Sequence, residues 1–240
     1  GFGTERAVKV LQEYLPDARI ARLDSDVGKA KKTVEKTLRE FKNKEYDILI
    51  GTQMIAKGHD FPSVTLVGVL LADIGLMLPS YRASETTFEL IAQAVGRSGR
   101  GALPGEALIQ TYNPQHYAIT LGAKQDYEMF YRREMQERHM GHYPPFYFLA
   151  CLTFSSKDEN RAILSAENIR DLVLAEKIPS LAAIGPMVPY FPCLGEWHRR
   201  NVLLQFRDPL KVKPFLGKLI HEYSGKGGVK IVCDVDPLDY

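Results

Sequence analysis

The chain has 240 residues, of which 45% are hydrophobic and 25% are charged, and its formal net charge is +2. This composition excludes an intrinsically disordered protein and a polybasic or acidic tail as the basis of binding. The three cysteines (Cys151, Cys193 and Cys233) are widely spaced and predict neither a disulfide framework nor a paired metal motif, which suits a reducing cytoplasm. The longest apolar run is too short for a membrane span, and no signal-peptide pattern opens the chain. Because the first residue is glycine rather than methionine, we expect a fragment or a processed chain.

The first part of the chain alternates between helical and strand patterns. Apolar spacing predicts helices over residues 4–14, 31–44, 82–98 and 115–138, and strands over residues 18–23, 46–52, 64–71 and 105–111. The strands at 46–52 and 64–71 are almost continuously apolar, which is typical of parallel strands buried on both faces. This order predicts an α/β fold with a doubly wound parallel sheet.

The pattern changes near residues 141–146, where two consecutive prolines cannot continue a helix. We therefore predict one domain over residues 1–140 and a second over residues 141–240. In the second domain, strands are expected at 148–154, near 181–184, at 202–206 and at 229–234, with helices at 158–176 and 212–223. This order indicates a smaller α+β domain with a largely antiparallel sheet.

The sharpest local motif is QAVGRSGR at residues 93–100, at the end of a predicted helix. Arg97 and Arg100, three residues apart in a turn relieved by Gly96 and Gly99, can both reach one anion, because planar guanidinium groups match phosphate oxygens bidentately. Taken alone, the motif is also compatible with a solvated helix end whose arginines bind the last carbonyl groups.

A second motif, GTQMIAKGHDFP at residues 51–62, follows a buried strand. In open α/β sheets, ligands bind beyond the carboxyl ends of the strands, where this loop is expected. This loop carries a hydroxyl, an amide, a cation and a carboxylate within nine residues, beside the flexible Gly58. The groups belong to Thr52, Gln53, Lys57 and Asp60. Each residue alone could simply cap the loop, but the two motifs together favour a binding site.

These two segments resemble motifs V and VI of superfamily 2 helicases. The opening GTER of residues 3–6 is similar to the start of the second RecA-like lobe in one branch, the primosomal protein N′ (PriA) family of replication-restart DNA helicases. The resemblance continues through YPPF at residues 143–146, RRNVL at 199–203 and VCDVDP at 232–237, so it covers essentially the whole chain in order. It implies a RecA-like second lobe followed by an accessory domain, in an ATP-dependent helicase that acts in primosome assembly at stalled forks.

The resemblance also implies roles for individual residues. Arg97 and Arg100 would face the γ-phosphate of ATP, with Arg100 as the arginine finger and Gln93 near the attacking water. Gly58 and Asp60 would lie on the nucleotide side of their loop. The implied DNA contacts are Thr52, Gln53 and Lys57 in the same loop, and Gly3 and Thr4 at a helix N-terminus.

Several parts of such a helicase are missing from this sequence. It contains no GxxxxGK[ST] phosphate-binding loop and no DExH-type acidic motif, so ATP and Mg²⁺ would be bound mainly by another lobe. The cysteine pairs through which the family binds zinc, and the strand that should precede the first helix, are also not in the sequence. We therefore expect the C-terminal part of a helicase that hydrolyses ATP negligibly on its own, and we expect no metal site in it.

Weaker candidates lie in the second domain and at its boundary with the first. Trp197, Arg199 and Arg200 form an aromatic and basic cluster that could stack on a base and hold a phosphate, or could be a half-buried tryptophan beside solvated charges. His139 and His142 have a spacing that could share a metal, although a polar hinge is the stronger interpretation.

Forked or single-stranded DNA, single-strand-binding protein and other primosome proteins are the implied partners. The alternatives are the second lobe of another superfamily 2 DNA translocase, or a non-catalytic nucleic-acid-binding module.

Overall fold

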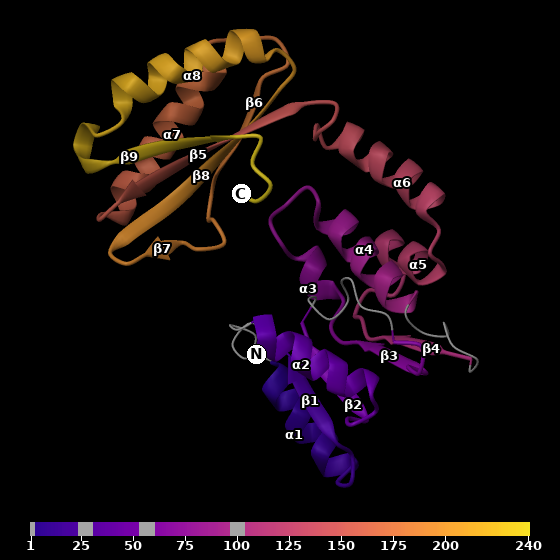
Figure 1. Cartoon of the computed structure of the whole chain (residues 1–240). Helices are drawn as coiled ribbons and strands as arrows, with labels where there is room; N and C mark the ends of the chain where they lie inside the picture. The colour runs from indigo at the N-terminus through magenta and orange to yellow at the C-terminus, as the bar shows by residue number, and fades with distance from the viewer. Residues whose placement is uncertain (1–2, 24–30, 53–60, 97–103) are drawn as a thin grey trace. The chain divides into compact units, whose positions relative to one another are not determined.

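The computed structural model describes residues 3–23, 31–52, 61–96 and 104–240 of the chain (Figure 1). Two compact units divide these residues between them. The first unit comprises Gly1–Asp73 and Thr87–Tyr127, and the second comprises Ile74–Thr86 and Glu128–Tyr240. The second unit therefore includes a short segment that precedes part of the first in sequence, whereas the two domains predicted at 1–140 and 141–240 are contiguous.

The first unit is built from short strands and amphipathic helices. Leu23 and Leu38, both buried, pack with Phe61 between the strands and the second helix. Gly3 caps the first helix with extended backbone, and its carbonyl oxygen accepts hydrogen bonds from the amides of Arg6 and Ala7 at 3.0 and 3.2 Å. In chain order, the elements up to α5 are α1 (Thr4–Tyr14), β1 (Ile20–Leu23), α2 (Lys31–Lys42), β2 (Ile48–Gly51), β3 (Leu66–Val69), α3 (Asp73–Leu76), α4 (Ala83–Val95), β4 (Glu106–Ile109) and α5 (Tyr117–Lys124). Of these, nearly all of α3 and the start of α4 belong to the second unit.

The strands of this unit pair in parallel, as the helix–strand alternation predicts. β1 pairs with β2, and β3 pairs with β4, each in parallel register. Within the described residues these are two separate two-stranded sheets, so the parallel pairing is confirmed but a single doubly wound sheet is not formed. The expectation that the strand at 64–71 is buried on both faces is wrong for this structure. Leu66 and Leu70 are each more than half exposed, and among the described residues β3 pairs with β4 alone.

The second unit is an antiparallel sheet with two helices on one face (Figure 1). The strand order is β6-β8-β5-β9, and β7 forms a hairpin with β8. This arrangement agrees with the predicted α+β domain. Its elements are α6 (Tyr127–Met140), β5 (Phe148–Ser156), α7 (Glu159–Ala175), β6 (Ala182–Met187), β7 (Cys193–Leu194), β8 (Trp197–Phe206), α8 (Pro209–Tyr223) and β9 (Lys230–Val235).

Alternation along the strands places apolar residues on both faces of this sheet. On one face, side chains such as Phe154 and Phe206 pack against α7 and α8 in the main core. The opposite face carries Leu149, Cys151 and Leu203, which are covered by other parts of the same unit. The covering side chains are Tyr81, Tyr143, Met187 and Tyr240.

Two other elements differ from the expectations. The helix predicted over 115–138 is two helices, because Gln125 adopts a left-handed backbone (φ 55°) that ends α5 before α6 begins. The strand predicted over 202–206 begins at Trp197, since its polar first half is held by pairing with β5 and β7.

Candidate nucleotide and nucleic-acid site

The predicted nucleotide-binding residues follow α4 and β2. Gln93 lies exposed in the last turn of α4, and Gly96 follows the end of that helix. Thr52 is exposed directly after β2, at the carboxyl end of the strand. Gln53, Lys57, Gly58 and Asp60 of the loop, and Arg97 and Arg100 of the turn, lie outside the described residues, so their assigned roles remain predictions.

The end of α4 is packed closely on α5. The Gln125 side chain donates a hydrogen bond from Nε2 to the carbonyl oxygen of Ala92 at 2.9 Å. A Cβ on Gly96 would lie 2.7 Å from that same nitrogen, so the glycine permits the contact. A Cβ built on Gly122 of α5 lies 3.1 Å from the Cβ of Ile91, which is fully buried. This packing holds the helix that leads directly into the motif arginines.

Asp73, which was not predicted as a site residue, joins the carboxyl ends of β3 and β4. Its carboxylate accepts hydrogen bonds from the amide of Tyr112 and the hydroxyl of Thr111, both at 2.9 Å, and from the amide of Asn113 at 3.2 Å. The hydrogen bond from Tyr112, with those from Thr111 and Asn113, holds the pKa of Asp73 below its usual value despite its burial. Its position, directly after an apolar strand, was the available sequence signal.

Gly3 and Thr4 stand at the beginning of α1, as the motif predicts. Gly3 is exposed, and a side chain built on it would meet open space. Local packing therefore does not require glycine at position 3. Helix N-termini attract anions through their backbone amides and their dipole, so this helix end is suited to a phosphate group.

The cluster predicted at the start of β8 is divided between the two faces of the sheet. Trp197, 40% exposed, and Arg199 lie on one face by strand alternation. Arg200 faces α7 instead. Its guanidinium bonds Glu159 and also donates to the carbonyl oxygen of Arg199 at 2.8 Å, and its side chain is only 12% exposed. The structure therefore brings Trp197 and Arg199 together and gives Arg200 a different partner.

Further residues on and beside this face were missed from the sequence. Asn201 shares the alternation of Trp197 and Arg199, is 4% exposed, and its Oδ1 finds no hydrogen-bond donor in the described part of the chain. Tyr190 and Phe191, in the loop between β6 and β7, are 65% and 62% exposed, with ring centroids 4.9 Å apart. The PYFP run at residues 189–192 between two strands was the signal that could have found them. We call Tyr190, Phe191, Trp197 and Arg199 the aromatic surface.

The two histidines considered for a metal contact different aromatic rings. His139 meets Phe146 edge-on at 4.8 Å, and His142 packs on Tyr147 at 4.5 Å. Among the described residues, no group of three or more His, Cys, Asp or Glu side chains could hold a metal ion.

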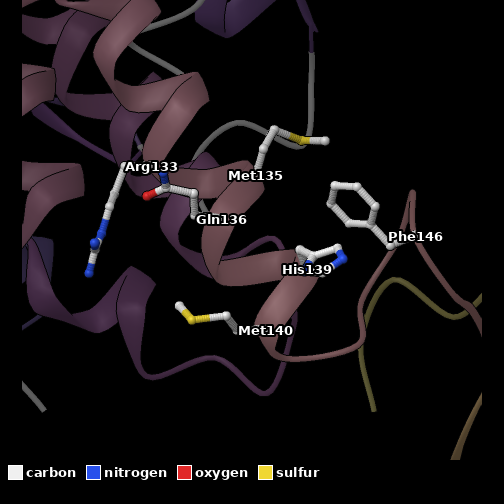
Figure 2. A pocket seen from close by; sticks show the side chains of 6 residues that line it. All are labelled: Arg133, Met135, Gln136, His139, Met140 and Phe146. Atoms are coloured by element: carbon white, nitrogen blue, oxygen red, sulfur yellow. The ribbon is translucent and has the colours of Figure 1, made fainter.

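His139 and Phe146 line an open pocket of about 480 Å³ beside the last turns of α6 (Figure 2). Its other lining residues are Arg133, Met135, Gln136 and Met140.

Comparison with known proteins supports the resemblance seen in the motifs. Residues 3–102 match the helicase conserved C-terminal domain. The chain is 40% identical to replication restart protein PriA of Bacillus subtilis over 240 residues, which is 99% of this chain and 30% of that protein. The corresponding protein of Chlamydia pneumoniae is 39% identical (99% and 32% coverage), and that of Borreliella burgdorferi is 42% identical (99% and 36%).

The chain thus spans about a third of the length of these relatives. No helix in the described ranges is both long and apolar enough to cross a membrane.

Proposed function

Since the chain is similar to PriA along its whole length, we propose that it is the second lobe and accessory domain of an ATP-dependent DNA helicase acting in replication restart. The observation that carries the proposal is the 40% identity over 99% of the chain, with both helicase motifs inside the 3–102 domain match. The substrates of the complete enzyme are ATP with Mg²⁺ and forked or single-stranded DNA. Its place of action is the bacterial cytoplasm.

In this proposal the first unit supplies the arginine side of a nucleotide site whose phosphate-binding loop belongs to another lobe. Arg100 is the arginine finger, Arg97 contacts the γ-phosphate, and Gln93 orients the attacking water. Guanidinium groups stabilise the charge that develops during phosphoryl transfer, which is worth about 10³–10⁵ in rate. The exposed position of Gln93 in the last turn of α4 supports this assignment. Gly58 and Asp60 approach the nucleotide from the loop after β2.

The same loop carries the proposed contact with DNA. Thr52, Gln53 and Lys57 hold backbone phosphates, and Gly3 and Thr4 hold another through the amides of α1. The exposure of Thr52 and Gly3 supports this. Hydroxyl and amide donors position a DNA backbone without reading its sequence. A loop that touches both ligands couples them, because each ligand then favours the same arrangement of the lobes.

The second unit contributes the aromatic surface as a DNA contact. Exposed tyrosine, phenylalanine and tryptophan rings provide faces on which unpaired bases stack, at about 1–3 kcal/mol per base. Arg199 supplies a phosphate contact beside them, whereas Asn201 is buried and does not reach a base. Arg200 positions the strand through Glu159 instead of binding DNA.

Two further parts of the proposal concern the complete protein. Zinc, through cysteine pairs outside this sequence, belongs to the family resemblance. In this chain, Cys151 and Cys233 lie on adjacent strands but on opposite faces of the sheet, and Cys193 lies in a hairpin. This arrangement of the three cysteines does not fit a zinc site. Single-strand-binding protein and other primosome proteins are the proposed protein partners.

The nucleotide part is tested by ATP hydrolysis. The isolated 240-residue chain is expected to show negligible ATPase activity with or without single-stranded DNA. The full-length protein is expected to hydrolyse ATP, and Arg100→Ala to lower its kcat by about 10³-fold. Arg132→Gln, an exposed arginine of α6 paired with Glu128, is the matched control. Robust, Arg100-dependent hydrolysis by the isolated chain would contradict the proposal, as would an upstream reading frame without a phosphate-binding loop.

The DNA part is tested by affinity for forked DNA at fixed salt concentration. Trp197→Ala is expected to weaken binding by about 5–100-fold through the lost stacking. Arg199→Gln weakens it less and reduces the salt dependence. Arg200→Gln serves as the contrast, because its side chain bonds Glu159 and its loss lowers thermal stability more than affinity. Equal affinity of the wild type and Trp197→Ala would remove the aromatic surface from the DNA site.

A further inference from the structure

The sheet of the second unit is covered by helices on one face and is partly open on the other (Figure 1). Phe154 of β5 packs on the helix side, so strand alternation places Ser155 on the opposite face. That opposite face also carries Leu149, Cys151 and Leu203, which are buried. Ser155, further along β5, is partly exposed, and we call its end of the face the open end.

The C-terminal residues close the other end of this face. Tyr240 is one of the side chains that cover the buried residues. The amide of Tyr240 donates to the carbonyl oxygen of Pro79 at 3.0 Å, and the Ser80 hydroxyl donates to the carbonyl oxygen of Leu238 at 2.5 Å. The chain itself therefore occupies the closed end, and the open end is the part of the face that a ligand can reach.

Backbone pairing places two cations and a hydroxyl in one row across the open end. Arg199 of β8 is directly opposite Ser155 of β5, and Ser155 is directly opposite Lys230 of β9. Residues that are directly opposite in an antiparallel sheet share a face. Because neighbouring strands are about 4.8 Å apart, the Cα atoms of Arg199 and Lys230 are about 10 Å apart, with Ser155 on the strand between them. Both long side chains can converge over the serine.

Arg199 also acts electrostatically on this face. Burial raises the pKa of the Cys151 thiol to about 11, and the positive charge of Arg199 opposes that rise. Cys151 belongs to the buried part of the same face. The effect therefore agrees with the side of the sheet to which strand alternation assigns the guanidinium group.

In the part of the chain that the structure describes, neither cation of the row has an ion-pair partner. Lys157, just beyond the row, pairs instead with Glu196 at 2.7 Å. Asp234 shares the face, but it lies four residues along β9 from Lys230, which is about 13 Å. Charges at that separation are largely screened, since the screening length is about 10 Å at 0.1 M salt. The two positive charges of the row are thus available to an anionic ligand.

Trp197 lies beside the row on the same face. It precedes Arg199 by two residues in β8, about 7 Å along the strand, and it is 40% exposed. An unpaired base can stack on such a ring while the adjoining phosphate binds the cations. Bases inside a duplex must first be unstacked before they offer a face, so the pair of features suits a single strand.

We propose that Arg199, Ser155 and Lys230 form a phosphate row, which binds a backbone phosphate of single-stranded DNA while the adjoining base stacks on Trp197. The guanidinium and ammonium groups neutralise the phosphate, and the Ser155 hydroxyl donates a hydrogen bond to it. The inference rests on the proposed function, because it defines how the second unit holds the DNA assigned to it there. The row contacts the backbone and does not read the base sequence.

The test measures the affinity of the 240-residue chain for two fluorescein-labelled single strands, oligo(dT) and an abasic strand of the same length, at several salt concentrations. Lys230→Gln is expected to weaken binding of both strands about 5-fold and to reduce the slope of log affinity against log salt by about 0.7, because a phosphate contact loses a cation. Ser155→Ala is expected to weaken binding of both about 3-fold and to leave the slope unchanged, since the hydroxyl carries no charge. Trp197→Ala is expected to weaken binding of oligo(dT) alone.

A double variant tests whether Arg199 and Lys230 hold the same phosphate. The loss of affinity in Arg199→Gln combined with Lys230→Gln is expected to be smaller than the product of the two single losses, because the second substitution removes a contact that the first has already weakened. Losses that multiply would show two separate contacts and would overturn the shared phosphate row.

Lys211→Gln is the matched control. Lys211 is an exposed lysine of α8, on the helix-covered side of the sheet, and it pairs with Asp208 at 3.1 Å. This variant is expected to keep the wild-type affinity and salt slope, and an equal loss in it would overturn the inference by assigning the effect to net charge. Unchanged binding in folded Lys230→Gln, or a loss with oligo(dT) but not with the abasic strand, would also overturn it. Failure of the wild-type chain to bind oligo(dT) would instead overturn the proposed DNA contact.

Discussion

At the residue scale, the Arg19–Asp47 pair shows how one carboxylate connects two segments. Asp47 accepts from the Arg19 side chain at 2.7 and 2.9 Å and from the Arg19 amide at 2.9 Å. The same arginine donates to the carbonyl oxygen of Lys44 at 2.9 Å, so hydrogen bonds connect the turn before β2 to the residue before β1. These hydrogen bonds from Arg19 lower the pKa of Asp47 to about 2.

A pH dependence follows from that shift. A carboxyl group with a lowered folded-state pKa stabilises the fold above its unfolded-state pKa and loses this contribution as the pH falls. The difference in melting temperature between the wild type and Asp47→Asn should be largest above about pH 4 and should shrink towards pH 2. Thermal unfolding followed by circular dichroism over this range is the measurement. A difference that stays constant with pH would contradict the assignment of the shift to this pair.

Two glycines of the second unit predict opposite effects of the same substitution. Gly185 has φ +131°, and a Cβ there would lie 2.7 Å from the carbonyl oxygen of Asn201, so Gly185→Ala should destabilise the unit by about 2 kcal/mol or more. Gly217 lies inside α8 with open space around its Cβ position, so Gly217→Ala should stabilise by about 0.5–1 kcal/mol. Urea unfolding measures the change in the free energy of unfolding of each variant. Changes of the same sign in both variants would contradict the prediction.

At the element scale, α7 illustrates how one cap determines where a helix begins. The Asp158 side chain accepts hydrogen bonds from the amides of Asn160 and Arg161 at 2.9 and 3.3 Å. Asp158→Ala should therefore cost about 1 kcal/mol in the free energy of unfolding. Asp171→Ala, later in the same helix and exposed, is the charge-matched control and should cost less. A denaturation series compares them, and equal costs would show that capping is not the cause.

Helices and buried strands could be read from the sequence because their signals are local. The spacing of Ala162, Ala166, Ile169 and Val173 predicts α7 by itself, and the prolines after residue 143 predict the end of α6. The break at Gln125 could not be predicted, since it depends on a left-handed backbone at a residue with no strong preference for it. The exposure of β3 could not be predicted either, because the burial of a strand depends on what packs on the two faces of its sheet.

The candidate site, like the fold, could be predicted from the sequence only in part. The order of the motifs was sufficient to predict helicase-like chemistry, but the positions of the side chains were not. Arg199 and Arg200 lie on opposite faces of the sheet because both belong to β8, in which neighbouring side chains alternate between the faces. The sequence pattern did not show that β8 already begins at Trp197. The Glu85–Arg138 contact joins residues 53 positions apart, and no periodic pattern in the sequence marks it.

At the scale of the whole molecule, the second unit depends on a segment that is distant in sequence. Residues 74–86 supply Tyr81 to the sheet face made by Leu149, Cys151 and Leu203. A fragment of residues 128–240 should therefore fold with that face less covered, bind the dye ANS, and melt at a lower temperature than the same unit within the whole chain. Tyr81→Ala in the whole chain should reproduce part of this change. A fragment as stable as the intact unit would contradict it.

The hydrogen bonds between residues 79–80 and residues 238–240 have a consequence for synthesis on the ribosome. Residues 79–85 are made long before their partners, and at about 5–20 residues per second the delay is on the order of 10 s. During that interval Tyr81 has no sheet to cover, and the start of α4 has no anchor from α6. A product that stops before residue 238 contains both motifs but lacks the hydrogen bonds to residues 79–80. The hydrogen bonds of residues 79–80 therefore form only after residues 238–240 have been synthesised.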